Sequence, residues 1–391
     1  MKFSKTSQLI LVSMIGLMVA TWLTGCEIVT ADFLYVASYS STDTAGVIQS
    51  FAVDADSGAL RTASSSVSLT GLDPVSLAVS PDYKYLFAAA QNPSSTGGSI
   101  VSYTIALNGV LTSNKSLTLT DTPKAIAVNA AGTYLYVISG TSTVTLSEYA
   151  ITSGSIASAP TASKTISIGS DVVAPEGVAV LANGDAVYAA VADTTAGNGY
   201  VYGYIIGSDG ALTASANSPY SAGVRPSGIA ADPSSAYVYV TDYASSQLIG
   251  YRVVNSTTLS YLTAGPFSSG KQPTGVAIDP RGRFLYVSNA LDNTVTAYAI
   301  TTETGVPSSV SGTSSTSNPT DTYPVAITVE PAYGRYVYTG NSLGKSVSGF
   351  KLNSTSGALT TTQATPYNTT YAPTAVLAVP HGNHASITPV D

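Results

Sequence analysis

One phrase of small, branched and aromatic residues recurs along the chain at a nearly constant interval. Its clearest copy is PTGVAIDPRGRFLYVSN at residues 273–289. When the copies are aligned on their first proline, they lie 47–52 residues apart and begin at Pro74, Pro123, Pro175, Pro226, Pro273, Pro324 and Pro373. Seven units with a period near 50 predict a propeller or another repeat array rather than two or three separate domains.

Each unit predicts an innermost strand, a tight turn and a second strand. Two positions after each proline stands a small residue, and the next position is always a branched aliphatic residue. A short apolar run without alternation indicates a strand buried on both faces, and small side chains suit the crowded centre of a propeller. Turn residues such as Asp279-Pro280-Arg281-Gly282 follow, and then an aromatic and β-branched run such as Phe284-Leu285-Tyr286-Val287.

A third strand is clearest at Thr294–Ile300, and a turn containing glycine leads to a fourth strand in every unit except the one around Asn255. Four antiparallel strands per unit, without an amphipathic pattern of helix length, predict an all-β, seven-bladed β-propeller. The chain opens with a second-strand phrase at 33–36 and closes with a first-strand phrase at 373–379. We therefore expect the C-terminal strand to complete the N-terminal blade, which removes free strand edges.

The first residues predict export and lipid attachment. Lys2 and Lys5 precede an apolar run from Leu9 to Ala20, which is shorter than the roughly 20 residues that a spanning helix needs. The run ends at Leu23-Thr24-Gly25-Cys26, which resembles the lipobox of bacterial lipoproteins. The alternatives are an ordinary secretory signal with a chance cysteine and an uncleaved N-terminal anchor helix.

If the lipobox is used, Cys26 carries the lipid and the chain divides into a lipoprotein signal peptide at 1–25, an anchor and short linker at 26–32, and one propeller domain at 33–391. The implied partner is the membrane of the bacterial cell envelope. Glu27 is not the Asp that suggests inner-membrane retention in such lipoproteins, which favours the outer membrane in a Gram-negative cell. Cys26 is also the only cysteine, so an internal disulfide is excluded.

The composition argues against nucleic-acid binding. Only 9% of residues are charged and the net charge is −7, whereas phosphate contact needs clustered Lys and Arg. No P-loop, G-x-S-x-G or H-E-x-x-H pattern occurs, and we expect no cofactor.

Two sets of residues carry atoms that could bind a metal ion. His381 and His384 lack a third ligand nearby except the terminal Asp391, so a surface turn is favoured over a metal site. Four oxygen-bearing residues in loops after the second strands lack the spacing of a cation loop, and turn capping explains them more simply: Asp193, Asp242, Asp292 and Asn293.

The strand endings Tyr239-Val240-Thr241-Asp242 and Tyr286-Val287-Ser288-Asn289 resemble those of YVTN-type propellers. Gly-Ala-Leu turns at residues 58, 210 and 357 resemble the lactonase branch of these propellers, which includes bacterial 6-phosphogluconolactonases. The resemblance covers nearly all of residues 33–380. It implies lactone hydrolysis by His, Glu and Arg at the mouth of the central channel, but no histidine flanks the seven prolines, and no catalytic residue is carried over.

Four charged residues flank the predicted starts of the innermost strands: Asp73, Lys124, Glu176 and Arg225. Propeller geometry predicts that they surround the channel mouth with alternating sign. Glu176 could activate a water while Arg225 or Lys124 stabilises an oxyanion, or the group could bind a polar ligand without reaction. The simplest interpretation is that opposite charges neutralise one another and solvate the funnel.

The sequence thus supports two functions. The favoured one is an exported, lipid-anchored binding or scaffold module, whose variable loops at the channel mouth recognise an unknown small molecule or protein. The alternative is a lactonase-type hydrolase that acts on a lactone or a sugar-derived ester.

Overall fold

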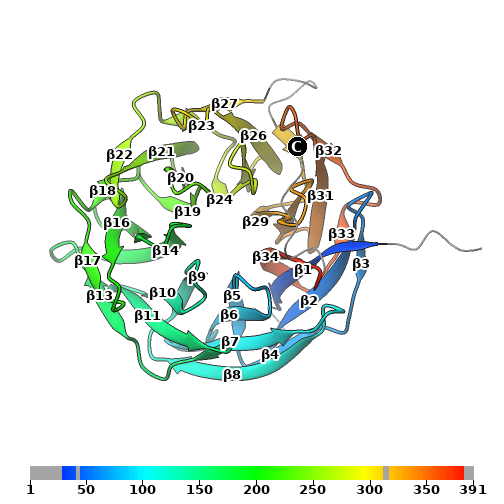
Figure 1. Cartoon of the computed structure of the whole chain (residues 1–391), viewed down its shortest axis with the longest axis horizontal. Helices are drawn as coiled ribbons and strands as arrows, with labels where there is room; N and C mark the ends of the chain where they lie inside the picture. The colour runs from blue at the N-terminus through cyan, green and yellow to red at the C-terminus, as the bar shows by residue number, and fades with distance from the viewer. Residues whose placement is uncertain (1–28, 41–44, 311–316, 383–391) are drawn as a thin grey trace, which may run out of the picture.

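The computed structural model describes residues 29–40, 45–310 and 317–382. Within these residues, seven small antiparallel sheets stand around one open axis (Figure 1), so the predicted all-β, seven-bladed propeller is confirmed. In this part of the chain, no helix has the length and apolar character needed to cross a bilayer. The predictions for Cys26, Glu27 and His384 concern residues outside the described part.

The two inner strands of each blade correspond to the repeated sequence phrase. The innermost strands are β5 (Asp73–Val79), β9 (Pro123–Val128), β14 (Val173–Val180), β19 (Pro226–Ala231), β24 (Pro273–Ile278), β29 (Pro324–Val329) and β34 (Ala372–Pro380). The second strands are β6 (Tyr85–Gln91), β10 (Tyr134–Gly140), β15 (Ala186–Asp193), β20 (Tyr237–Asp242), β25 (Phe284–Asn289), β30 (Tyr336–Asn341) and β1 (Thr30–Tyr39).

The third strands are β7 (Gly98–Ile105), β11 (Val144–Thr152), β16 (Asn198–Ile206), β21 (Gln247–Val254), β26 (Thr294–Ile300), β31 (Ser346–Leu352) and β2 (Ala45–Asp54). One described blade has a continuous outer strand, β8 (Leu111–Leu119). In the others the outer strand is split into two short pieces that pair with the same third strand. These pieces are β3 (Leu60–Thr62) and β4 (Val67–Thr70), β12 (Ser155–Ile156) and β13 (Ala162–Ile166), β17 (Leu212–Ala214) and β18 (Tyr220–Ser221), β22 (Thr258–Tyr261) and β23 (Phe267–Ser268), β27 (Pro307–Ser309) and β28 (Ser317–Pro319), and β32 (Leu359–Thr361) and β33 (Tyr367–Asn368).

The last strand completes the first blade. β34 pairs antiparallel with β1, so that Phe33 lies opposite Val379 and Val36 opposite Val376, and β1 pairs in turn with β2. Figure 1 shows the two ends of the described chain meeting in this blade. The predicted interlock of the chain ends is confirmed, and the propeller closes without a free inner edge.

Every innermost strand has a β-bulge directly after its proline. In β24, Pro273 lies opposite Asn289 and Gly275 lies opposite Ser288, so Thr274 has no partner of its own on β25. The same skip occurs in each blade and leaves these residues unpaired: Val75, Lys124, Glu176, Ser227, Thr274, Val325 and Thr374. A bulge changes the direction of the side chain it carries, and bulges recur beside functional sites.

The hydrophobic core is divided among the contacts between blades. The described residues form seven clusters of buried apolar side chains, and each cluster combines residues of two neighbouring blades. The small residues of the innermost strands fit this arrangement. A Cβ on Gly228 would lie 3.1 Å from the Cα of Gly275 in the next blade, because the inner strands converge there.

The glycine turns before the outer strands receive an aromatic ring from the neighbouring blade. Gly357 has a φ of +75°, and a Cβ at this position would lie 2.3 Å from Cδ1 of Phe284. The buried Tyr286 hydroxyl donates a hydrogen bond of 3.0 Å to the Gly357 carbonyl. The same hydrogen bond joins other neighbouring blades, from Tyr35 to Gly109, from Tyr239 to Gly305 and from Tyr338 to Gly58.

The unit without a turn glycine has a matching change in its neighbour. Asn255 and Ser256 form this turn with φ angles of +48° and +63°. The neighbouring second strand begins with the small, fully buried Ala186, whereas the other second-strand phrases begin with Tyr or Phe. Ala186 leaves the space that a ring fills elsewhere, and the turn can therefore carry side chains. Tyr188 still donates a hydrogen bond of 2.8 Å to the Thr257 carbonyl.

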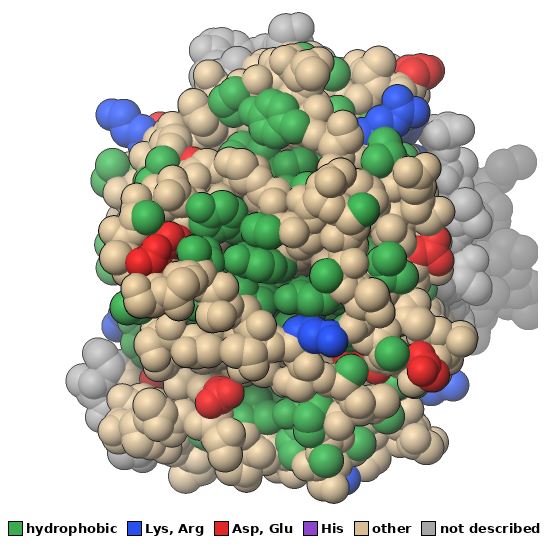
Figure 2. Space-filling model, turned by 90° about the vertical axis from the view of Figure 1, so that its left-hand side faces the viewer, with side chains coloured by type: hydrophobic (Ala, Val, Ile, Leu, Met, Phe, Trp, Pro, Cys, Tyr) green, Lys and Arg blue, Asp and Glu red, His purple; other side chains and the backbone are tan. Residues whose placement is uncertain are grey.

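The outside of the propeller carries little charge. Figure 2 shows the side around β17, where isolated acidic and basic side chains are scattered among polar and hydrophobic ones without forming a patch. This agrees with the charged fraction of 9% in the whole sequence.

Two carboxyl groups are buried together at the closing blade. Asp32 on β1 and Glu330 after β29 are both fully buried. The Glu330 carboxylate accepts hydrogen bonds from the backbone N–H groups of Tyr333 and Arg335 at 3.0 and 2.7 Å. Burial, and then repulsion by Glu330, raise the pKa of Asp32 well above its usual range.

We predict that Tyr286→Phe lowers the free energy of unfolding by about 1–3 kcal/mol, because it leaves the buried Gly357 carbonyl without this donor. Chemical denaturation measures the change. Tyr261→Phe, at a side chain that is 41% exposed, is the control and should change stability by less than about 0.5 kcal/mol. Equal effects of the two variants would contradict the role of the hydroxyl.

We also predict that Asp32→Asn raises the free energy of unfolding, and that the increase is larger at higher pH. The raised pKa keeps Asp32 protonated in the folded state at pH values where the unfolded chain has released its proton. The free energy of unfolding therefore falls as pH rises above about 4, until the folded group ionises. Urea unfolding should show that the free energy of unfolding of the variant exceeds that of the natural protein by more at pH 8 than at pH 5. Parallel pH profiles for the two proteins would refute this assignment.

Candidate functional site at the channel mouth

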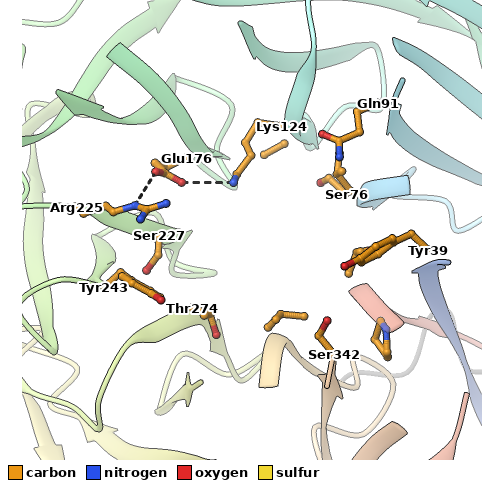
Figure 3. Close-up of a pocket in the computed structure, with 15 residues that line it drawn as sticks. Tyr39, Ser76, Gln91, Lys124, Glu176, Arg225, Ser227, Tyr243, Thr274 and Ser342 are labelled. Carbon is orange, nitrogen blue, oxygen red and sulfur yellow. Dashed lines mark hydrogen bonds and ion pairs between the residues drawn. The ribbon is translucent and has the colours of Figure 1, made fainter. Parts of the chain in front are cut away.

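The seven bulge residues converge on one pocket. Its volume is about 500 Å³, within the range of roughly 300–1,000 Å³ that is typical of small-molecule sites (Figure 3). The residues that line it are the bulge residues Val75, Lys124, Glu176, Ser227, Thr274, Val325 and Thr374, together with Tyr39, Ser76, Gln91, Ala125, Arg225, Tyr243, Ser342 and Pro373. Each blade thus contributes to a single opening.

Three bulge residues use their hydroxyl groups to connect blades. Ser227 donates to the Pro273 carbonyl at 2.6 Å, and Thr274 donates to the Pro324 carbonyl at 2.8 Å. Thr374 donates to the Pro74 carbonyl at 2.6 Å, which joins the closing blade to the next one. Because each hydroxyl has one proton to donate, these groups offer a ligand only their lone pairs.

Glu176 lies between two cations on one wall of the pocket. Its Oε1 is 3.4 Å from Nε of Arg225, and its Oε2 is 3.5 Å from Nζ of Lys124. The Glu176 side chain is only 7% exposed, whereas the side chains of Lys124 and Arg225 are 48% and 56% exposed. Figure 3 shows the three together on one side of the opening. The wall has a buried negative charge, two accessible positive charges and a net charge of about +1.

Asp242 fixes the loop that carries Arg225. Its carboxylate accepts hydrogen bonds of 2.9 Å from the backbone N–H groups of both Val224 and Arg225. The Tyr243 N–H donates a hydrogen bond of 2.8 Å to the Arg225 carbonyl. Gly223 has a φ of +78°, and a Cβ there would lie 2.0 Å from Oδ2 of Asp242. Glycine is therefore required for Asp242 to reach this loop.

Two tyrosines continue the charged wall. The guanidinium carbon of Arg225 lies 5.2 Å from the centroid of the Tyr243 ring, which is a cation–π contact. The hydroxyls of Tyr243 and Tyr323 are 3.3 Å apart. This hydrogen bond, followed by burial, raises the pKa of Tyr323. The two hydroxyls share one hydrogen bond, so one of them keeps its proton for a ligand at the rim.

The structure brings three of the four charged candidates together in the pocket. Lys124, Glu176 and Arg225 come from three successive blades with alternating sign, and they occupy one wall rather than the whole circumference of the opening. Asp73 is half-buried at the start of β5 and does not line the pocket, although its cross-strand neighbour Gln91 does. Burial raises the pKa of Asp73.

The sequence did not single out Tyr39, Gln91, Tyr243 and Ser342 as pocket residues. All four share a position that could have identified them. Each stands at or directly after the end of a second strand, which is the end that faces the channel mouth.

His381, the histidine that the structure describes, does not line this pocket. His381 follows β34 at the strand end opposite Pro373, and its ring centroid lies 5.3 Å from that of Phe33. A strand of this length separates the two ends by about 25 Å. A histidine general base in the pocket therefore cannot come from His381.

The loop oxygens accept backbone hydrogen bonds: Asp193 caps its own turn, whereas Asp292 and Asn293 bond to distant loops. Asp193 accepts hydrogen bonds from the backbone N–H groups of Thr195 and Ala196, both at 2.9 Å. Asp292 accepts from the Lys271 N–H at 2.8 Å, and Asn293 accepts from the Tyr323 N–H at 2.7 Å. Among the described residues, no group of three or more His, Cys, Asp or Glu side chains is arranged to hold a metal ion.

A family model identifies the family, and solved structures share the fold. The model of the lactonase family of seven-bladed β-propellers matches residues 5–118 and 252–377, together more than half of the chain. No curated protein sequence matches.

Solved structures at low sequence identity have the same fold. A periplasmic gluconolactonase from Pseudomonas aeruginosa is 19% identical, with a TM-score of 0.74, and covers 90% of this chain and 100% of its own. A proposed 6-phosphogluconolactonase from Bacteroides uniformis is 18% identical, with the same TM-score and coverage. A protein from Lactobacillus plantarum is 18% identical, with a TM-score of 0.71, again over 90% of this chain and 100% of its own.

Proposed function

Because the chain belongs to the lactonase family of seven-bladed β-propellers, we propose that it hydrolyses a lactone in the channel-mouth pocket. The observation that carries this proposal is the buried Glu176 carboxylate between the more exposed Lys124 and Arg225. Ester hydrolysis needs a base and a group that stabilises the oxyanion. The carboxylate on this wall can accept a proton from water, and the two cations can stabilise the oxyanion.

In this mechanism Glu176 accepts a proton from a water molecule while the water oxygen bonds to the lactone carbonyl carbon. Arg225 or Lys124 stabilises the negative charge that develops on the carbonyl oxygen. The ring C–O bond then breaks, and the ring oxygen takes up the proton to become a hydroxyl group. The product is a hydroxy acid, and its carboxylate can be held by the net positive wall until release. Asp242 is a positioning residue here, because it holds the Arg225 backbone.

The second candidate is a module that binds a polar or anionic ligand without turning it over. Two observations favour it. Both oxygens of Glu176 already face a cation, so a water molecule must compete with Lys124 and Arg225 for them. Within the described residues, the pocket lining contains no histidine. Such a module would use the same wall to hold the ligand's carboxylate.

Turnover separates the two candidates. Purified residues 27–391 are assayed for acid release from glucono-δ-lactone, 6-phosphogluconolactone and δ-valerolactone. We predict that Glu176→Gln, which keeps the side-chain shape, reduces kcat/KM for the substrates that are hydrolysed by at least about 100-fold. Glu303→Gln, at an exposed turn residue, should leave the rate unchanged.

An unchanged rate in Glu176→Gln would exclude Glu176 as the base. If no lactone is hydrolysed, titration calorimetry with gluconate tests the binding candidate, and heat that disappears in Arg225→Ala would support it.

We also propose that the protein is exported and held at the cell envelope by a lipid on Cys26. The leader sequence supports this proposal, and the periplasmic location in the name of the Pseudomonas aeruginosa gluconolactonase is consistent with export. Domain limits at 1–25, 26–32 and 33–391 belong to the same proposal. A phosphorylated sugar lactone of central metabolism is a poor candidate for an exported enzyme, because that substrate forms in the cytosol.

We predict that Cys26→Ala moves the protein from the membrane fraction to the soluble fraction of the expressing bacterium. Each buried methylene of an acyl chain contributes roughly 0.8 kcal/mol to membrane binding, so loss of the lipid should release the protein. Metabolic labelling with a fatty-acid analogue should mark the natural protein and not the variant. Unchanged membrane retention of Cys26→Ala would refute the lipid anchor.

A further inference from the structure

The pocket has two unlike halves. The blades that begin with β9, β14 and β19 contribute the charged wall of Lys124, Glu176 and Arg225. The blades that begin with β29, β34 and β5 contribute the opposite side. We call this opposite side the apolar arc, and its residues are Val325, Pro373, Thr374, Val75 and Tyr39. Figure 3 shows Tyr39 across the opening from Glu176 and Arg225.

The apolar arc has few groups that could bind ligand hydroxyls. Val75 and Val325 occupy the bulge position at which Thr274 and Thr374 carry hydroxyls. The Thr374 hydroxyl donates to the Pro74 carbonyl and lies 3.2 Å from the Ala37 carbonyl. The same blades also contribute polar residues: Ser76 and Gln91 come from the blade of Val75, and Ser342 comes from the blade of Val325.

This chemistry discriminates between kinds of lactone. A ligand hydroxyl that is buried against the valines without a partner costs about 1–3 kcal/mol. A methylene group in the same place gains about 0.8 kcal/mol. A polyhydroxylated ring would therefore be penalised where it contacts the arc, whereas an alkyl chain would be stabilised.

A second hollow continues from the arc toward the rim. Its volume is about 270 Å³, and it shares Tyr39 and Ser342 with the main pocket. Its other lining residues are Ser40, Leu343, Lys345, Tyr371 and Ala372. Leu343 is 69% exposed and therefore offers an accessible apolar surface in this hollow. Because Tyr39 and Ser342 line both hollows, the second hollow is adjacent to the main pocket, and Leu343 lies in the second.

We propose that the preferred ligand is a lactone that carries an alkyl or acyl chain rather than a sugar lactone. Its ring carbonyl lies at Glu176 and Arg225, and its chain lies on the apolar arc and extends past Tyr39 over Leu343. This inference rests on the proposed lactone hydrolysis at the same pocket, and it adds the class of substrate. The main pocket and the second hollow together have room for a ring and a chain of several carbons.

The test compares three lactones with the same six-membered ring: δ-valerolactone, δ-decalactone and glucono-δ-lactone. For purified residues 27–391, kcat/KM for δ-decalactone should exceed that for each of the other two by at least about tenfold, since its side chain adds several methylenes. A higher kcat/KM for glucono-δ-lactone than for δ-decalactone would overturn the proposal.

Variants locate the chain-binding surface. Val325→Asn and Leu343→Asn should each lower the ratio of kcat/KM for δ-decalactone to that for δ-valerolactone by about threefold or more. Leu343 is exposed on a loop, so its variant should fold even if Val325→Asn does not. Leu107→Asn is the matched control, because Leu107 is 78% exposed and lies outside both hollows, and it should leave the ratio unchanged. A ratio unaffected by Leu343→Asn would overturn the placement of the chain.

Failure of the proposed reaction would be distinguishable from failure of this inference. If no lactone is hydrolysed, calorimetry compares binding of the two product acids, 5-hydroxydecanoate and gluconate. Tighter binding of 5-hydroxydecanoate would support the apolar arc even though hydrolysis had failed. Tighter binding of gluconate, or no binding of either acid, would overturn the inference.

Discussion

The pairing of β1 with β34 is the constraint on which the rest of the structure depends. These strands come from opposite ends of the chain, and their pairing places the innermost strand of one blade beside the second strand of the same blade. The loop-closure entropy of such a pairing must be offset by the contacts it makes possible. Thr374 connects the closing blade to the next one through Pro74, so the closure also fixes the distance across the pocket.

Once the propeller is closed, the β-bulge that recurs in each blade contributes both to stability and to the pocket. The residue after each proline is freed from pairing by a bulge and is aimed at the axis. At Ser227, Thr274 and Thr374 it bridges to the next blade through a hydroxyl. At Glu176 the bridge consists of ion pairs to groups contributed on both sides. A change of side chain at one of these positions therefore alters the ligand surface and leaves the strand pairing intact.

Much of this architecture could be predicted from the repeat. The prolines mark the innermost strands, and the aromatic runs mark the second strands. The chain ends, at Phe33 and Val379, indicate the closure. The bulges could not be predicted, because nothing in the sequence distinguishes a paired residue from an unpaired one after proline. The match between the Asn255 turn and Ala186 also needed coordinates, since the two lie in different blades.

The residues of the site were predicted less completely than the fold. Charge and strand position identified Lys124, Glu176 and Arg225, and these three do share a wall. The same criteria also selected Asp73, which precedes its proline as Arg225 does but does not line the pocket. They gave no weight to Tyr39 and Tyr243, whose role depends on where the second strands end. Ligand chemistry followed only from the distribution of charged and apolar side chains around the closed opening.

Native-state hydrogen exchange on residues 27–391 tests the closure most directly. If the propeller is one closed unit, the paired amides of β1 and β34 should open with the same free energy as those of β10 and β15, because no part can open without global unfolding. Opening of β34 at a free energy several kcal/mol lower than that of β10 would show an unclosed array, and the single pocket would lose its basis.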